Sequence, residues 1–271
     1  MPSVPLSHLL ANGLPQPDWT APWYRPVADV GQAAWRALEA GRPVHHALET
    51  AAAAARRPDP AGWVPPAFVP AHEQPPGTAY ESFVFTNRSV PTRDTLHDFF
   101  NGLVWCAYPR TKRHLNELQA AAIARDGVGS RRGPLRDAIT LLDENGAVFS
   151  APPELVSALQ ARDWHQLFVA RRADWRHARM WLFGHALLEK LVAPRKDITA
   201  HVLCAPPGLD TIGQVDAWMQ STLPAAHLAN KPFSPMPVLG VPGWWPANSQ
   251  ADYYRDPAVF RARRDTVGPR T

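Results

Sequence analysis

The 271-residue chain has few cysteines and no long hydrophobic run, and each shortage argues against a class of protein. Its two cysteines, Cys106 and Cys204, are too few for a disulfide framework or a four-thiolate zinc site. The most apolar stretch, residues 180–192, is interrupted by charged side chains and is too short to cross a bilayer. The N-terminal residues have no basic start and contain several prolines, which is not typical of a secretion signal. These absences predict a cytoplasmic protein without a membrane span.

Three catalytic signatures are missing as well. No GxSxG motif is present, which argues against a serine hydrolase with a nucleophile elbow. No glycine-rich phosphate loop precedes a helix, so the chain is not a P-loop protein. His185 and Glu189 are four residues apart but lack the second histidine of the HExxH zinc-protease pattern.

Proline and tryptophan, in contrast, are abundant. The chain has 30 prolines and 11 tryptophans, and the prolines concentrate in residues 1–76 and 206–246. Proline favours extended segments over helices and central strands, so these regions predict irregular arms that pack over a core. The formal net charge is +4, but the basic residues are scattered among acidic ones. That distribution does not predict a nucleic-acid-binding surface.

The remaining chain alternates between helical and strand-like patterns. Helices are predicted over residues 30–57 (with a break at 41–43), 94–105, 111–125, 153–161, 184–191 and 211–223; strands are predicted over 80–85, 135–142, 147–149, 179–183 and 198–204. The residues Asp143-Glu144-Asn145-Gly146 predict a hairpin turn, and we attribute the two carboxylates to that turn. The expected fold class is α/β or α+β, with a single mixed sheet flanked by helices and long Pro-rich irregular N- and C-terminal arms.

Five motifs occur in a fixed order along the second and third quarters of the chain and near its end. They are VPTRDTLHDFFNGLVW (90–105), YPRTKRHLNELQA (108–120), RGPLRDAITLLDENGA (132–147), FGHALLEKL (183–191) and PVLGVPGWWPANSQADYYRDPAVF (237–260). Together they resemble an uncharacterised family of proteobacterial proteins, catalogued as domain of unknown function 3025. The resemblance implies a bacterial, intracellular protein and implies no activity. We therefore expect residues 1–76 to be a Pro-rich arm with helices packed on the core, and residues 77–271 to be the family core domain, within one structural domain overall.

The helix predicted over 94–105 carries a polar stripe opposite its apolar face. Asp94, His97, Asp98 and Asn101 follow the spacing i, i+3, i+4 and i+7. Imidazole, carboxylate and amide groups bind divalent metals or exchange protons. The alternative is an ordinary solvated face, with the aspartates favouring the helix N-terminus. Trp105 lies on the same side and argues against plain solvent.

The next predicted helix offers groups that suit an anion. Lys112 lies near its start, where free backbone N–H groups also favour negative charge, and Asn116 follows one turn later. With Arg93 and Asn101, these residues are expected to hold an anionic substrate. Alternatively, Asn116 hydrogen-bonds neighbouring segments inside the protein.

Two further positions complete the set. Asp137 is expected in an apolar strand, where a buried carboxylate needs a partner such as Arg93, Lys112 or His97. His185 follows a predicted strand and begins a helix, which is where α/β proteins commonly place ligand-binding residues. The alternative for His185 is a buried histidine paired with the glutamate four residues later.

These residues predict either an enzyme or a binding protein. The enzyme would be a hydrolase, metal-assisted or metal-free, acting on a small anionic or phosphate-containing ligand. The expected catalytic residues are His97, Asp98, Asp137 and His185; the expected substrate-binding residues are Arg93, Asn101, Lys112 and Asn116; and the candidate ligands of a divalent metal are His97, Asp98, His185 and Glu189. The alternative is a non-catalytic binding or scaffold protein whose His/Asp/Asn cluster is a structural hydrogen-bond network.

Overall fold

The structure, a computed structural model, describes residues 6, 10, 16–55, 66–127 and 133–263. Its first two helices, α2 (Ala28–Glu39) and α3 (Val44–Ala55), pack against each other. The expected break at 41–43 separates them, because Gly41 adopts a positive φ of 80° and Pro43 follows shortly after. Before α2, aromatic side chains of residues 19–24 are buried in the core, so this part of the N-terminal arm is held in place by packing.

Eight further α-helices follow within the described residues. They are α4 (Tyr80–Asn87), α5 (Leu96–Ala107), α6 (Pro109–Asp126), α7 (Pro134–Asn145), α8 (Pro153–Ala161), α9 (His185–Lys190), α10 (Ile212–Thr222) and α11 (Ala225–Ala229). Thr95 is the N-cap residue of α5, and its hydroxyl accepts a hydrogen bond from the backbone N–H of Asp98. The apolar face of α5 is fully buried and includes Phe99, Phe100 and Leu103.

Two sheets accompany the helices, which makes the fold α+β. The main sheet has the order β4-β3-β5-β6, formed by Arg179–Leu182, Gly146–Ser150, Thr199–Ala205 and Ser234–Pro237. Strands β3 and β5 are parallel and the other pairs are antiparallel, so the sheet is mixed, as predicted. All five residues of β3 are buried, which is typical of a central strand covered on both faces.

A small second sheet was not predicted from the sequence. It consists of two parallel strands, β1 (Ala67–Pro70) and β2 (Ser89–Thr92). Strand β1 lies in the segment expected to be an irregular Pro-rich arm, so that part of the arm is regular. The C-terminal arm also contributes structure, because it supplies β6 and buries Tyr253, Tyr254 and Phe260.

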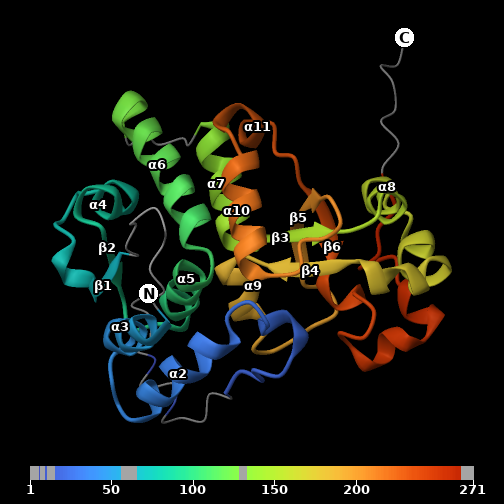
Figure 1. Cartoon of the computed structure of the whole chain (residues 1–271), viewed down its shortest axis with the longest axis horizontal. Coiled ribbons are helices and arrows are strands. Elements are labelled where there is room, and N and C mark those ends of the chain that lie inside the picture. The colour runs from blue at the N-terminus through green and yellow to red at the C-terminus, as the bar shows by residue number, and fades with distance from the viewer. Residues whose placement is uncertain (1–5, 7–9, 11–15, 56–65, 128–132, 264–271) are drawn as a thin grey trace.

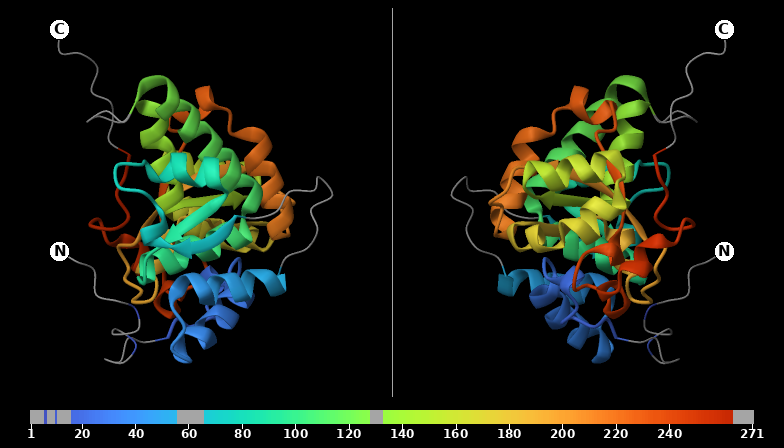
Figure 2. Two further views of the ribbon diagram at one scale, coloured as in Figure 1. Left: turned by 90° about the vertical axis from the view of Figure 1, so that its left-hand side faces the viewer. Right: turned by 90° about the vertical axis from the view of Figure 1, so that its right-hand side faces the viewer.

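The helices divide into groups around the main sheet. In Figure 1, α6, α7 and α10 run side by side next to the sheet, while α4, β1 and β2 lie beyond α6. Figure 2 shows the N-terminal helices α2 and α3 along one side of the molecule, below the small sheet. Helix α9 contacts both α5 and α7, and this junction positions the site described below. No helix in the described ranges combines the length and apolar character needed to span a bilayer.

The strand predicted over 80–85 is wrong, since these residues lie in helix α4. A short apolar run fits a strand and a buried helix equally well, and its own length does not decide between them. Packing decides here, because α4 lies against α6 and ends at Arg88 in the left-handed conformation, with φ of 51°.

The strand predicted over 135–142 and its hairpin turn are also wrong. These residues form helix α7, which runs directly into β3. Pro134 is favourable at the first position of a helix, and Ala138, Ile139 and Leu142 recur at helical spacing on its buried face. The correction matters for the site, because it turns Asp143 from a hairpin residue into a residue on the side of a helix.

The close packing of α3 and α5 depends on Gly102. A Cβ atom added at Gly102 overlaps the side chain of Leu48. We expect Gly102→Ala to lower the free energy of unfolding by about 1–3 kcal/mol, since overpacked cores must shift side chains or backbone. Gly213→Ala in α10, where an added Cβ meets nothing within 4 Å, is the matched control and should be neutral or stabilising. Urea unfolding compares the two, and equal effects would contradict this account.

Candidate functional site

Two histidine rings meet where α9 packs against α5 and α7. His97 lies in the first turn of α5 and His185 is the first residue of α9. Their Nε2 atoms are 3.1 Å apart, and the rings meet edge to face at an interplanar angle of 78°. Gly184 permits this approach, because a Cβ atom there would lie 2.5 Å from the backbone oxygen of Glu144. The start of α9 is therefore pressed against the end of α7.

Each ring has a carboxylate on its other side. His97 Nδ1 lies 3.0 Å from Oε2 of Glu189, which is one helical turn after His185 on α9. His185 Nδ1 lies 3.6 Å from Oδ2 of Asp143 on α7, slightly beyond hydrogen-bond length. The site thus consists of two carboxylate–imidazole pairs whose Nε2 atoms face each other, an arrangement that we call the histidine pair.

The contacts of the histidine pair need two hydrogens. One lies on His97 Nδ1, which faces the carboxylate of Glu189. The other lies between the two Nε2 atoms, where one ring donates to the other. Two neutral rings, or one imidazolium and one neutral ring, both supply these hydrogens.

The surroundings decide which ring holds an added proton more strongly. The hydrogen bond that His97 donates to Glu189 raises the pKa of His97 above its usual 6.5. Burial lowers the pKa of His185 to about 4, with Lys112 and His97 contributing in the same direction against the opposing effect of Asp143. Of the two rings, His97 is therefore the stronger base and His185 the weaker one.

A buried ion pair supports Asp143 from the opposite side. Lys112 Nζ lies 2.5 Å from Asp143 Oδ1, and it also donates to Asn101 Oδ1 at 2.9 Å. Asn101 in turn donates to the hydroxyl of Tyr80 at 3.0 Å. Burial opposes the ionisation of Asp143, but Lys112 and His185 hold its pKa below the usual range. A continuous polar chain thus links α4, α5, α6, α7 and α9.

A polar pocket of about 350 Å³ opens onto the histidine pair. His97 is accessible from it, with 39% of its side chain exposed, whereas His185 is buried. Arg93 lines the rim with 60% of its side chain exposed, and it binds Asp98 through two hydrogen bonds of 3.0 and 2.7 Å. Nη1 of Arg93 makes no hydrogen bond to any residue that the structure describes. This atom is oriented by the Asp98 pair and is available to an anion.

A second pocket of about 250 Å³ shares Tyr80, Asp143 and His185 with the first. Its wall includes Glu81, which accepts hydrogen bonds from the carboxamide of Asn116 at 2.6 Å and from Gln119 at 3.1 Å. Burial raises the pKa of Glu81, although Asn116 and Lys112 oppose that rise.

The structure brings together most of the residues that the sequence singled out. His97, Asp98, Asn101 and Arg93 line the polar pocket with His185. Glu189 accepts a hydrogen bond from His97. Lys112 is buried and forms an ion pair with Asp143, outside the lining of the polar pocket. Asp94 lies before the helix and accepts a hydrogen bond from the backbone of Val44.

Two expected residues are elsewhere. Asp137 is exposed in the first turn of α7, because the segment is a helix and the buried strand that would have enclosed it does not exist. Its carboxylate is favourable there next to the helix N-terminus. Asn116 lies one turn after Lys112 on α6, binds Glu81 and does not line the polar pocket, so its position agrees with the internal hydrogen-bonding alternative.

The four metal-ligand candidates do not converge on one point. Asp98 is turned toward Arg93, and Glu189 is turned toward Nδ1 of His97. Within the described part of the chain, no group of three or more His, Cys, Asp or Glu residues is arranged to hold a metal ion. The structure therefore gives no support to the predicted divalent metal at this position.

Sequence reasoning underestimated Asp143 and missed Tyr80 and Glu81. A signal for Asp143 was available, because Arg136, Thr140 and Asp143 follow the spacing i, i+4 and i+7 and line the second pocket together. Tyr80 and Glu81 offered no such signal, since their role depends on the packing of α4 against α6.

The molecule is thus an α+β protein with a histidine-centred polar pocket. A model of the family described as Protein of unknown function (DUF3025) matches residues 67–264, so the chain belongs to that family. No curated protein and no solved structure matches the chain.

The buried ion pair can be tested by stability. Lys112→Met leaves Asp143 without its closest counter-charge, and we expect a loss of about 3–5 kcal/mol in the free energy of unfolding. The double variant Lys112→Met/Asp143→Leu should recover part of this loss, since no buried charge is left unpaired. Arg125→Met, which breaks an exposed pair with Asp126, is the control and should leave the urea midpoint unchanged. Equal effects of Lys112→Met and Arg125→Met would contradict the assignment.

The charge of His97 predicts a pH dependence. Because Glu189 raises the folded-state pKa of His97, the stabilisation by this pair is complete below the unfolded pKa of 6.5. It is lost as the pH rises through the folded-state pKa. Glu189→Gln should lower the pKa of His97 and remove this loss, while the exposed His165→Gln should change neither. NMR titration of the ring protons measures the pKa, and an unchanged value in Glu189→Gln would refute the assignment.

Proposed function

We propose that this protein is a hydrolase that uses His97 and His185 as an acid–base pair on a small anionic substrate, such as a phosphate or carboxylate ester. The observation that carries the proposal is the histidine pair itself: two imidazoles with facing Nε2 atoms at the wall of an open polar pocket, with pKa values shifted in opposite directions. In the proposed reaction His97 enters protonated and His185 neutral. Neighbouring titratable groups whose pKa values are pushed apart are the usual basis for assigning an acid and a base.

The proposed reaction begins when substrate separates the two rings. His185 Nε2 takes a proton from a water molecule, whose oxygen attacks the phosphorus or carbonyl carbon of the ester. Asp143 stabilises the imidazolium that forms, in the way that a carboxylate supports the histidine of a catalytic triad. His97 Nε2 gives its proton to the leaving oxygen as the ester bond breaks.

The direct contact between the rings then has a role in turnover. After the reaction His185 carries the extra proton and His97 is neutral. Transfer of one proton across the 3.1 Å contact between the Nε2 atoms restores the resting state without exchange with solvent. The attacking water supplies the hydroxyl of the acid product. The proton that it loses to His185 replaces the one that His97 gave to the leaving alcohol.

Arg93 is the proposed substrate-binding residue. Its guanidinium lies at the rim of the pocket and is oriented by Asp98, and guanidinium groups suit carboxylates and phosphates. The pocket volume of about 350 Å³ is suited to a small metabolite. The proposal includes a cytoplasmic location, which is supported by a content of only two cysteines, too few for the disulfide frameworks common in small secreted proteins.

Hydrolysis of chromogenic esters tests the proposal. We expect the protein to hydrolyse at least one of 4-nitrophenyl phosphate, bis(4-nitrophenyl) phosphate and 4-nitrophenyl succinate. His97→Gln and His185→Gln should each lower kcat about 10²–10⁴-fold, which is the usual contribution of general acid–base catalysis. Arg93→Gln should chiefly raise KM, because the guanidinium binds substrate and does not transfer a proton.

A matched control separates chemistry from folding. His46 is exposed on α3, so His46→Gln should leave both kcat and the far-UV circular dichroism spectrum unchanged. If His97→Gln and His185→Gln fold normally and keep the full rate, the acid–base roles are wrong.

The alternative function is a binding or scaffold protein in which the polar cluster is structural. It is favoured by the unbroken chain of hydrogen bonds from Lys112 through Asn101 to Tyr80, which links three helices inside the protein. Under this alternative, His97→Gln and His185→Gln lower stability, and no ester in the panel is hydrolysed.

A further inference from the structure

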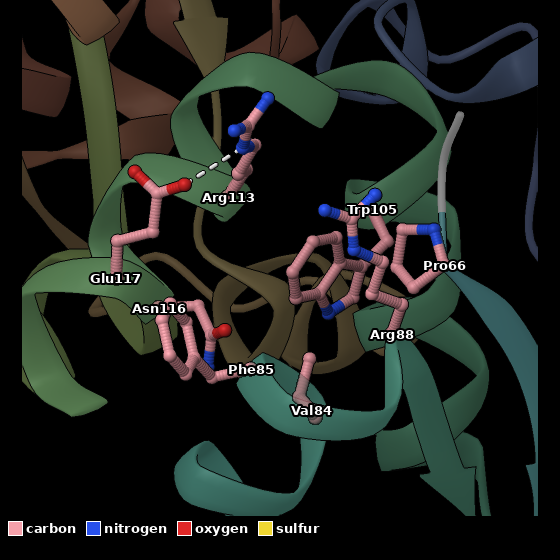
Figure 3. Close-up of a pocket in the computed structure, with 8 residues that line it drawn as sticks. All are labelled: Pro66, Val84, Phe85, Arg88, Trp105, Arg113, Asn116 and Glu117. Carbon is pink, nitrogen blue, oxygen red and sulfur yellow. Dashed lines mark hydrogen bonds and ion pairs between the residues drawn. The ribbon is translucent and has the colours of Figure 1, made fainter. Parts of the chain in front are cut away.

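A separate, smaller pocket, which we call the hollow, lies among α4, α5 and α6 and shares no lining residue with the polar pocket. Figure 3 shows Phe85 and Asn116 on one side of it, and Trp105 with Arg88 on the other. Arg113 projects from α6 above the hollow. Nothing in the proposed hydrolytic reaction uses these residues.

The size of the hollow excludes a small-molecule site. Its volume is about 70 Å³. A cavity that holds benzene measures about 150 Å³, and pockets for drug-sized ligands measure about 300–1,000 Å³. The hollow therefore has room for part of one side chain, and whatever carries that side chain must remain outside, against the surface.

The walls of the hollow are aromatic. Trp105 is 3% exposed, and its indole N–H has no hydrogen-bond partner among the residues that the structure describes. Phe85 is 53% exposed and is the large hydrophobic side chain that stands free on the described surface. Phe85 therefore places an exposed aromatic ring beside a small pocket lined by Trp105, and aromatic residues are enriched in the cores of protein interfaces.

The hollow is lined by two arginines, Arg88 and Arg113, and one glutamate, Glu117, so positive charge is in excess. Arg88 is exposed and makes no ion pair with any described residue, while Arg113 pairs with Glu117 at 2.7 Å and stays half-exposed. Arginine and aromatic residues are the types enriched in the energetically dominant part of protein interfaces. A partner that covers Phe85 must bring its own backbone past Arg88 and Arg113, and carboxylates complement these two side chains.

We propose that this hollow is the docking site for an acidic segment of a partner protein. The segment inserts one apolar side chain between Phe85 and Trp105 and places carboxylates against Arg88 and Arg113. Charge complementarity and the volume for one anchoring side chain carry the proposal, and it does not depend on the proposed hydrolase activity.

A labelled peptide tests the proposal with the full-length protein. The probe is acetyl-Gly-Asp-Asp-Val-Asp-Asp-Gly-amide with a fluorophore, because a valine side chain is smaller than a phenyl ring, and binding is measured by fluorescence anisotropy. We expect saturable binding, which Phe85→Ser and Arg88→Asn each weaken at least about tenfold. Both residues are exposed, and asparagine tolerates the φ of 51° at position 88, so both variants are expected to fold. The control is Arg125→Ala, which removes an exposed arginine at the end of α6 that does not line the hollow, and it should change the affinity less than about twofold.

Four outcomes would overturn the proposal. The first is no binding of the peptide at about 1 mM protein. The second is equal binding of a peptide with lysines in place of the aspartates, and the third is equally tight competition by benzoate or phenyl phosphate. The fourth is self-association that Phe85→Ser abolishes, measured by sedimentation, which would identify a second copy of this chain as the occupant.

Discussion

The buried ion pair between Lys112 and Asp143 is the interaction on which the rest of the site depends. It joins α6 to α7 in a place where both side chains are largely shielded from water, so the attraction between them replaces part of the hydration that each has lost. The carboxylate of Asp143 then faces His185, and the ammonium of Lys112 holds Asn101. Without this pair, nothing on α7 would orient the buried histidine.

Carboxylates and nitrogen-bearing groups alternate along the cluster, which allows several ionisable groups to lie together. Glu189 contacts His97, His97 contacts His185, His185 faces Asp143, and Asp143 pairs with Lys112. Burial, together with Lys112 and His97, lowers the pKa of His185 to about 4, so this ring resists an added proton. It separates the pair of Glu189 with His97 from the pair of Asp143 with Lys112.

The scaffold around the cluster is held by packing that reaches far along the chain. Aromatic rings from the N-terminal arm, such as Trp19 and Tyr24, pack against Phe100 of α5. The hydroxyl of Tyr24 also donates to the backbone of Leu188 in α9. The arm therefore fixes the two helices that carry the histidine pair, although it lies outside the matched family region.

Much of this protein was readable from its sequence. The helices 94–105, 153–161 and 184–191, the strands 179–183 and 198–204 and the mixed sheet were expected from local patterns, because hydrophobic spacing and proline placement are properties of short segments. His97, Asn101 and His185 were singled out for the same reason, since each stands at a polar position in a strongly patterned element.

The tertiary structure decided which elements the ambiguous apolar segments form and which polar side chains meet. Residues 80–85 and 135–142 are apolar runs that suit a strand or a helix, and only their packing against α6 and α9 selected the helix. That choice exposed Asp137 and turned Asp143 inward. The sequence by itself determined which chemical groups and local elements are present. Only the packing of distant helices decided which of those groups meet, because contacts between α5, α7 and α9 join residues separated by tens of positions in the chain.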